Sequence, residues 1–357
     1  MREPVADLQD DDSTKDWGTR AMTVRIGING FGRIGRNYLR AARLLGADVE
    51  VVGINDLTSP ETLAHLLKYD STHGRFGSDV QVDGSNLVLD SGPIAVLAER
   101  DPKALPWSDL GADVIIESTG HFTSKESASA HLDAGAKRVI ISAPGTGVDA
   151  TFVVGVNDDQ FDPATDVVVS NASCTTNCFV PMVKVLDDAF GIDVGLMTTV
   201  HAYTNDQNLL DLAHKDLRRS RAAAINIVPT STGAARATSL VLASMKGRLD
   251  GTSLRVPIPV GSITDFTAIV RSTTVEEIND AFKAAAAGAL SGVLVYTDEP
   301  IVSSDIVGTT ASCTFDSLMT IVQPIDEAKS LIKVFGWYDN EWGYSNRLVD
   351  LARYVGR

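Results

Sequence analysis

The sequence predicts an α/β protein of two domains: an N-terminal doubly wound parallel sheet, then an α+β catalytic domain with a mixed sheet. Three observations predict it. The 357 residues exceed one typical domain, and 44% of them are hydrophobic. Up to about residue 150, short β-branched segments alternate with helix-compatible ones, which is typical of parallel strands joined by helices. Beyond that point strand-like segments dominate.

The elements of the first region follow from this alternation. We expect a hairpin between strands over residues 79–82 and 86–89, because Asp83-Gly84 is a favoured turn. Helices are expected over residues 34–45 and 61–67. The parallel strands are expected over residues 24–28, 49–54, 114–117 and 139–141.

The second region is expected to contain longer strands and few helices. Residues 206–226 lack either periodicity, and so long a loop inside a compact domain is usually functional. Helices are expected over residues 175–190, 232–245, 275–287 and, at the end of the chain, 341–354. Strands are expected over residues 151–156, 167–170, 194–200, 253–256, 264–270, 292–296 and 331–338.

Charge and composition exclude several classes of function. The net charge of −15, from 31 basic and 46 acidic residues, disfavours nucleic acid or an anionic membrane as the main partner. No stretch is apolar for long enough to span a bilayer. Residues 1–21 are acidic and lack the apolar part of a signal peptide, so we expect a disordered tail. Three cysteines are too few for a disulfide framework, which favours the reducing cytoplasm.

A dinucleotide-binding motif lies between the first expected strand and helix. Gly30, Gly32 and Gly35 form a G-x-G-x-x-G, whose backbone turns tightly and admits a pyrophosphate at the helix N-terminus, as in Rossmann-type sheets. Asp56 follows the second strand, where a carboxylate binds a ribose diol and favours NAD over NADP; a helix cap is its alternative role. We therefore assign residues 22–173 to an NAD-binding domain and residues 174–340 to the catalytic domain.

A cysteine and a histidine stand at the ends of expected elements in the second region. Cys174 precedes the helix over residues 175–190, and a helix N-terminus lowers the pKa of a thiol. His201 ends a strand and could reach Cys174 as general base and acid. Alternatively, Cys174 could be a small buried residue with a structural role. That structural role fits Cys178 better. No metal site is predicted, since no second Cys or His pair has ligand spacing.

These motifs together resemble the phosphorylating glyceraldehyde-3-phosphate dehydrogenase family from residue 23 to about residue 355. The segments that carry the resemblance include INGFGRIGR at 28–36, SNASCTTNC at 170–178, HAYTNDQ at 201–207 and WYDNEWGYSNR at 337–347. The resemblance implies an oxidoreductase that converts D-glyceraldehyde 3-phosphate and inorganic phosphate to 1,3-bisphosphoglycerate with NAD reduction, through a cysteine thiohemiacetal and a thioester. It also implies a cytoplasmic homotetramer acting in glycolysis or gluconeogenesis, and a C-terminal segment, residues 341–357, that packs back on the NAD-binding domain.

The resemblance implies a role for each site residue. Cys174 would be the nucleophile and His201 the base. The substrate phosphate would be held by Thr204, Arg219 and Arg255, and the attacking phosphate by Ser173, Thr175, Thr232 and Gly233. Besides the glycines, the cofactor would contact Arg33, Ile34, Asp56, Arg100, Ser142 and Asn340. Arg255 within an apolar strand needs an anion. Thr204 and Thr232 could instead be turn residues, and Arg219 a solvated or subunit contact.

Rival functions stay open at this point. Erythrose-4-phosphate dehydrogenase shares the scaffold but uses water, whereas Thr175, Thr232 and Gly233 favour phosphate. A semialdehyde or acyl-phosphate reductase runs the same thioester chemistry. A non-enzymatic, moonlighting dinucleotide-binding protein is disfavoured because Cys174 and His201 are both present. Ala213 stands where NAD-preferring relatives often carry proline, so some use of NADP is conceivable.

Overall fold

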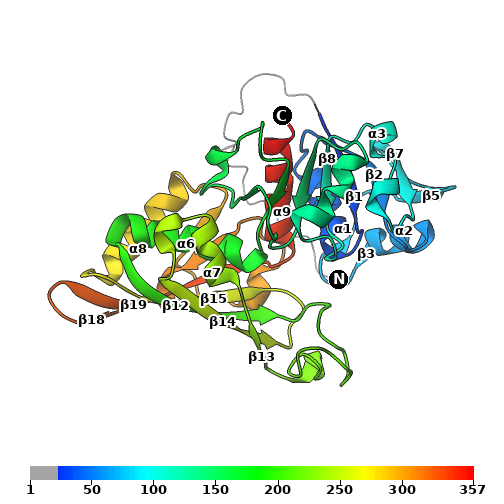
Figure 1. Ribbon diagram of the computed structural model, residues 1–357. Coiled ribbons are helices and arrows are strands. Elements are labelled where there is room, and N and C mark those ends of the chain that lie inside the picture. Colours follow the sequence, from blue (N-terminus) through cyan, green and yellow to red (C-terminus); the bar gives the residue numbers. More distant parts are fainter. Residues whose placement is uncertain (1–22) are drawn as a thin grey trace.

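Two sheets organise the chain in the computed structural model, which describes residues 23–357 (Figure 1). The predicted tail, residues 1–21, lies outside the described residues. The α/β class is confirmed, with one mainly parallel sheet and one mixed sheet. A further small sheet pairs β3 (Tyr69–Asp70) with β4 (Gly74–Arg75).

The first sheet is parallel except at the hairpin edge, where β6 pairs antiparallel with both of its neighbours. Its spatial order is β10 (Ala150–Thr151), β11 (Val168–Ser170), β9 (Arg138–Ile141), β8 (Val114–Glu117), β1 (Val24–Asn29), β2 (Val49–Asn55), β7 (Gly92–Leu97), β6 (Asn86–Leu89) and β5 (Gln81–Asp83). The parallel strands expected from the sequence are confirmed to within one residue at each end.

Helices cover both faces of the first sheet, as a doubly wound fold requires. On one face lie α1 (Arg33–Leu44), α2 (Pro60–Lys68) and the C-terminal α9 (Trp342–Val355), whose buried side chains share a core with β1. On the other lie α3 (Trp107–Leu110), α4 (Lys125–Ala128) and α5 (Ala130–Asp133) around the fully buried Trp107. In Figure 1, α9 runs beside α1, so the last helix packs against the first helix of the same sheet.

The second sheet is mixed, because β12 pairs parallel with β14 and antiparallel with β15. Its order is β13 (Val228–Ser231), β14 (Leu249–Val256), β12 (Ile192–Ala202), β15 (Ser262–Arg271), β19 (Lys329–Tyr338), β17 (Cys313–Asp316) and β16 (Leu294–Thr297), with β18 (Ile321–Pro324) also beside β19.

One face of this sheet is covered by α6 (Cys174–Phe190) and α8 (Val275–Ala287). Aromatic pairs fix these helices: Phe179 meets Phe266 edge-on at 4.8 Å, and Phe282 stacks on Phe315 at 3.7 Å between ring centroids. Thr274 begins α8 with a capping box. Among the described residues, no helix combines the length and the apolarity that crossing a membrane would need.

Three expectations about elements were wrong or incomplete. The helix expected over residues 232–245 shortens to α7 (Ala234–Ala237) and two 3₁₀ turns, since Thr238 and Ser239 hydroxyls donate to backbone carbonyls of the preceding turn. The strand expected over 151–156 ends at Thr151, because the N–H of Val153 donates to Asn157. Strands β7, β13, β17 and β18 and the short strands β3 and β4 were not predicted.

Candidate active site

The glycine loop joins β1 to α1 in a conformation that larger residues cannot adopt. Gly30 has φ +93°, and a Cβ there would lie 2.7 Å from the nitrogen of Thr119. A Cβ on Gly35 would lie 2.3 Å from the carbonyl oxygen of Gly30. A Cβ on Gly32, in contrast, would point into open space. The loop therefore has a packed floor and an open upper side, as a bound pyrophosphate needs.

Asp56 fastens this loop and does not cap a helix. One carboxylate oxygen accepts from the N–H of Phe31 at 2.9 Å, and the other from the N–H of Thr58 at 3.0 Å. The cap of α2 is Ser59, whose hydroxyl accepts from Thr62. The alternative role of Asp56 as a cap is therefore wrong. The carboxylate stands at the carboxyl end of β2, where ligands of parallel sheets bind.

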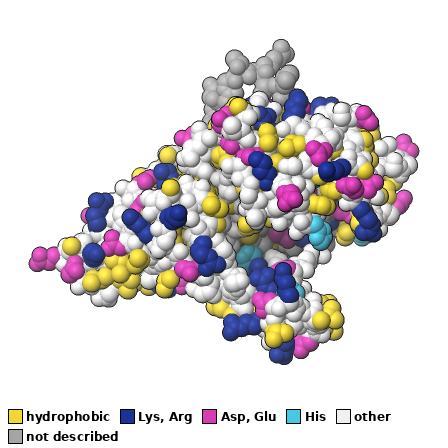
Figure 2. Space-filling model, in the orientation of Figure 1, with side chains coloured by type: hydrophobic (Ala, Val, Ile, Leu, Met, Phe, Trp, Pro, Cys, Tyr) yellow, Lys and Arg dark blue, Asp and Glu magenta, His cyan; other side chains and the backbone are white. Residues whose placement is uncertain are grey.

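Two cavities meet along this edge of the sheet. The smaller, of about 410 Å³, is lined by Asp56 and Arg100, and the larger, of about 590 Å³, by Cys174 and His201. Gly32, Ser118 and Thr119 border both. Figure 2 shows the molecule hollowed between its two halves, with histidine side chains beside the hollow. An elongated cleft over a glycine loop and a helix N-terminus fits a dinucleotide.

Other residues expected at the cofactor line the larger cavity in different ways. Ile34 and Ser142 border it directly. The guanidinium of Arg33 is held by Asp70, at 2.6 Å, and by Glu341, so what Arg33 offers a cofactor is its backbone. Asn340 borders the same cavity, and its Oδ1 accepts from Gly261 and Ser262, which leaves the amide Nδ2 to donate.

The chain turns sharply before Cys174. Ala172 has φ +55°, a strained value for a residue with a Cβ, and its carbonyl accepts from the hydroxyl of Tyr344. The hydroxyl of Ser173 then caps α6 by accepting from the N–H of Thr176 at 3.0 Å. Cys174 is thereby the first residue of the helix, one residue earlier than the predicted start, and it lies at the helix N-terminus as the sequence predicted.

Cys174 and His201 meet across the cleft. The Sγ of Cys174 lies 3.4 Å from Nε2 of His201, which is buried at the end of β12. Parallel pairing of β12 with β14 places Arg255 beside His201. One guanidinium nitrogen of Arg255 lies 2.7 Å from Nδ1 of His201 and 3.1 Å from the carbonyl oxygen of Ala202. A thiol, an imidazole and a cation thus come from three separate elements, α6, β12 and β14.

The position of the ring proton on His201 decides its chemistry. Nδ1 is also 2.7 Å from the carbonyl oxygen of Ala202, which can only accept, whereas Arg255 can only donate. With the proton on Nδ1, the ring bonds Ala202 and turns a lone pair on Nε2 toward Cys174. With the proton on Nε2, Nδ1 accepts from Arg255. The first arrangement is the one that can take a proton from the thiol.

Burial disfavours a negative charge on Cys174 alone and a positive charge on His201 alone. It raises the pKa of the Cys174 thiol to about 11, against the opposing effect of the Arg255 guanidinium. Burial and the same guanidinium lower the pKa of His201 to about 3. The lowered thiol pKa expected from the helix terminus is therefore wrong, because burial outweighs the dipole. Moving the proton from Sγ to Nε2 creates both charges together, where their attraction offsets the two costs.

The residues expected to bind phosphate are only partly gathered. Thr204 borders the larger cavity, and its hydroxyl donates to Asp206, which also holds the guanidinium of Arg219. Thr175 follows Cys174 in α6. Thr232 and Gly233 lie at the start of α7, where the Thr232 hydroxyl accepts from the N–H of Ala234, and they do not line this cavity.

Sequence reasoning missed several cavity residues. Thr119 follows β8, and a strand end followed by small polar residues and Gly120 is the signal that could have identified it. Further unpredicted lining residues are Tyr203, Asn205, Pro259 and Tyr344. Cys178, expected to be structural, is fully buried, and its Sγ lies 3.6 Å from the carbonyl oxygen of Gly336.

Comparison with known proteins covers both halves of the chain. A family model described as glyceraldehyde 3-phosphate dehydrogenase, NAD binding domain, matches residues 24–125, and one described as the C-terminal domain of the same enzyme matches residues 173–340.

Curated relatives are similar over nearly the full length. The "Glyceraldehyde-3-phosphate dehydrogenase 2" of Streptomyces avermitilis is 59% identical over 336 residues, which cover 94% of this chain and 99% of the relative. The "Glyceraldehyde-3-phosphate dehydrogenase" of Mycobacterium bovis is 61% identical over 345 residues, with the same two shares. The enzyme of that name from Geobacillus stearothermophilus is 58% identical over 335 residues, 94% of this chain and 98% of the relative.

Proposed function

This chain belongs to the glyceraldehyde-3-phosphate dehydrogenase family, and from that premise we propose that it oxidises D-glyceraldehyde 3-phosphate to 1,3-bisphosphoglycerate with NAD and inorganic phosphate, in glycolysis or gluconeogenesis. The observation that carries the proposal is the 3.4 Å contact between the Sγ of Cys174 and Nε2 of His201 at the rim of the cofactor cleft. That contact pairs a nucleophile with a base, as acyl transfer requires.

The chemistry at Cys174 runs through a thiohemiacetal and a thioester. The Sγ attacks the aldehyde carbon while the thiol proton passes to Nε2 of His201. His201 returns this proton to the former carbonyl oxygen, which gives the hydroxyl of the thiohemiacetal, and takes it back as the hydride leaves, which produces the thioester. Attack by inorganic phosphate on the thioester carbon breaks the bond to Sγ and releases the acyl phosphate, and the leaving thiolate of Cys174 takes the proton held by His201. The backbone N–H of Cys174, at a helix N-terminus, and the ring of His201 are placed to stabilise the oxyanion.

Two phosphates need two sets of donors. We assign the substrate phosphate to Thr204, Arg219 and Arg255, because fork-shaped guanidinium groups bind dianions in two-point contacts. The attacking phosphate is assigned to Ser173, Thr175, Thr232 and Gly233. In both sets, hydrogen bonds within the protein must break before the side chains can bind phosphate. Asp206 holds Thr204 and Arg219, and the hydroxyl of Ser173 caps α6. Phosphate binding therefore has to outcompete internal partners.

NAD is the cofactor of the family model that matches the first half of the chain. We assign its pyrophosphate to the loop of Gly30, Gly32 and Gly35 with the backbone of Arg33 and Ile34, its adenosine ribose to Asp56 near Arg100, and its carboxamide to Nδ2 of Asn340 near Ser142. Bound NAD supplies the hydride acceptor. The residues of this chain hold and orient it and exclude water from the thioester.

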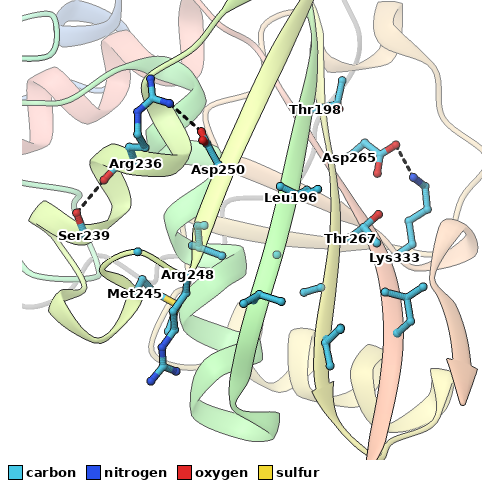
Figure 3. A pocket seen from close by; sticks show the side chains of 17 residues that line it. Leu196, Thr198, Arg236, Ser239, Met245, Arg248, Asp250, Asp265, Thr267 and Lys333 are labelled. Atoms are coloured by element: carbon cyan, nitrogen blue, oxygen red, sulfur yellow. Dashed lines mark hydrogen bonds and ion pairs between the residues drawn. The ribbon is translucent and has the colours of Figure 1, made fainter. Parts of the chain in front are cut away.

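We further propose a homotetramer in the reducing cytoplasm. The long loop over residues 206–226 exposes apolar side chains to solvent: Leu209, Leu210, Leu212 and Leu217. The sheet face opposite α6 and α8 is also bare, with Leu196 68% exposed (Figure 3). Its charges are satisfied internally by the pairs Arg236–Asp250 and Lys333–Asp265. Apolar surface of this extent is typical of a subunit contact.

Formation of NADH from glyceraldehyde 3-phosphate tests the proposed function. Reduction of NAD should require inorganic phosphate, and NADP should react more slowly because Asp56 repels a 2′-phosphate. Sustained turnover without phosphate would instead indicate hydrolysis of the thioester. No turnover with this aldehyde would contradict the proposed substrate.

A further inference from the structure

A buried hydroxyl joins the two elements that flank the nucleophile. The hydroxyl oxygen of Tyr338, at the end of β19, lies 2.9 Å from Oγ1 of Thr175 in α6 and 2.7 Å from Oγ1 of Thr199 in β12. The three residues are nearly inaccessible to solvent, with exposed fractions of 2%, 5% and 1%. Water therefore does not compete for these hydrogen bonds, and the three hydroxyls orient one another.

The ring of Tyr338 also contacts the base. It meets the ring of His201 edge-to-face, with 5.9 Å between centroids and planes at 72°. Burial, reinforced by the nearby thiols of Cys174 and Cys178, raises the pKa of Tyr338 well above its usual range. The phenol therefore keeps its proton and remains a hydrogen-bond donor throughout the accessible pH range.

Each hydroxyl has one proton, so the chain of three can run in two directions. When Thr199 donates to Tyr338 and Tyr338 donates to Thr175, the proton of Thr175 can be donated outward, to the sulfur of Cys174 or to a phosphate that takes its place. In the reverse direction, the hydroxyl of Thr175 donates its proton to Tyr338 and offers a phosphate only oxygen lone pairs. An anion needs donors, so a phosphate beside Thr175 is compatible with the first direction alone.

We propose that Tyr338 is a positioning residue for the attacking phosphate: its hydroxyl fixes Thr175 with the threonine proton directed at the phosphate. The proposal rests on the proposed function, in which Thr175 binds that phosphate. It gives Tyr338 a role in the second half of the reaction, release of the thioester, and none in the binding of the aldehyde.

Replacing Tyr338 with phenylalanine isolates the hydroxyl, because the ring that packs on His201 is kept. We expect Tyr338→Phe to raise the KM for phosphate about tenfold, the loss typical of one charge-assisted hydrogen bond. The KM for glyceraldehyde 3-phosphate and the first burst of NADH, formed before phosphate acts, should stay within about twofold of the wild type. Thr199→Val, which removes the far donor, should raise the KM for phosphate in the same direction.

Tyr38→Phe is the matched control. Tyr38 is also fully buried, but its hydroxyl has no hydrogen-bond partner within residues 23–357. This variant should leave every kinetic constant unchanged. If Tyr338→Phe leaves the KM for phosphate unchanged, or raises the KM for both substrates equally, Tyr338 does not position phosphate. Should Tyr338→Phe fail to fold, Thr199→Val decides by the same criterion.

Calorimetric titration with inorganic phosphate separates this proposal from the proposed function. Tyr338→Phe should bind phosphate about tenfold more weakly than the wild type, whether or not NAD is reduced. The wild type could lack phosphate-dependent turnover and still bind phosphate more tightly than Tyr338→Phe. The proposed function would then be wrong, but the positioning role of Tyr338 would be supported. Equal affinities would overturn the positioning role.

Discussion

The cofactor edge of the first sheet and the catalytic cleft of the second are built in opposite ways. At the cofactor edge, side chains at the ends of β1, β2 and β8 bond one another: Asn55 donates to Asn29 at 2.7 Å, and Asn29 to Glu117 at 2.6 Å. Each is the last residue of a short strand that the sequence predicts to within one residue. In the cleft, Cys174, His201, Arg255 and Tyr338 come from four elements, and pairing across the second sheet brings them together.

The two regions also treat charge differently. The carboxylate of Asp56 is partly exposed and accepts hydrogen bonds from two backbone N–H groups. In the cleft, burial shifts the pKa values of Cys174 and His201 toward their uncharged forms. The difference teaches that the binding edge offers a carboxylate held by backbone donors, whereas in the cleft burial beside the Arg255 guanidinium keeps Cys174 and His201 uncharged until a proton moves between them.

The largest expected effect separates the two regions completely. Cys174→Ser should lower NADH formation at least about a thousandfold, because the nucleophile is lost. The Kd for NAD, measured by calorimetry, should stay within about twofold because the glycine loop is intact. Cys178→Ser, the same change one turn further along α6, should keep most of the turnover. Loss of NAD binding in Cys174→Ser would mean that the cleft and the cofactor edge are not independent.

Arg255→Leu tests the cation of the cleft. We expect kcat/KM for glyceraldehyde 3-phosphate to fall about a hundredfold, mostly through KM, because a charge-assisted contact is lost. Glyceraldehyde without its phosphate should lose much less. Removing this guanidinium should also raise the pKa of His201, whose value it lowers. An unchanged KM would remove Arg255 from the phosphate site.

Asp70→Asn tests whether the cofactor edge depends on distant parts of the chain. Asp70 holds Arg33, which also bonds Glu341 beside α9. Burial alone would raise its pKa, but bonds from His73 and Arg33 lower it from 3.8 to about 2. The carboxylate therefore stabilises the fold above about pH 4, and this contribution, about 2 kcal/mol, is lost as the pH falls toward 2.

Urea unfolding at several pH values measures this contribution. The wild type should exceed Asp70→Asn in stability at pH 7, and the two should converge in acid. Asp79→Asn is the control, since Asp79 pairs with Lys68 at an exposed site and should change stability far less. A constant difference between the wild type and Asp70→Asn at all pH values would contradict the assignment.

The smallest expected effect concerns cofactor choice. Asp56→Ala should weaken NAD binding about tenfold, as one or two hydrogen bonds to a ribose are lost, while NADP binding weakens less or improves. Titration calorimetry with both cofactors measures the two affinities. Asp109→Ala, at an exposed position on α3, should change neither. Equal losses for NAD and NADP would show that Asp56 only holds the loop together.

Much of the fold could be predicted because its signals are local. The alternation of strands and helices, the glycine loop and the helix starting at Cys174 each depend on neighbouring residues. The helix expected over 232–245 was wrong because side chains of Thr238 and Ser239 compete for the backbone, which apolar spacing does not reveal. The contact of Cys174 with His201 was predicted because both stand at the ends of elements that meet at one edge.

The sequence by itself determined the two-sheet α/β architecture, the glycine loop with Asp56 and the choice of Cys174 and His201 as the proposed nucleophile and base, since short-range pattern and chain order specify them. Only the tertiary structure decided that Ala172 is strained, that Glu341 and Asp70 hold the guanidinium of Arg33 and that Tyr338 bonds Thr175. Burial and cross-sheet contacts set these, and both arise from residues far apart in the chain, which no local pattern records.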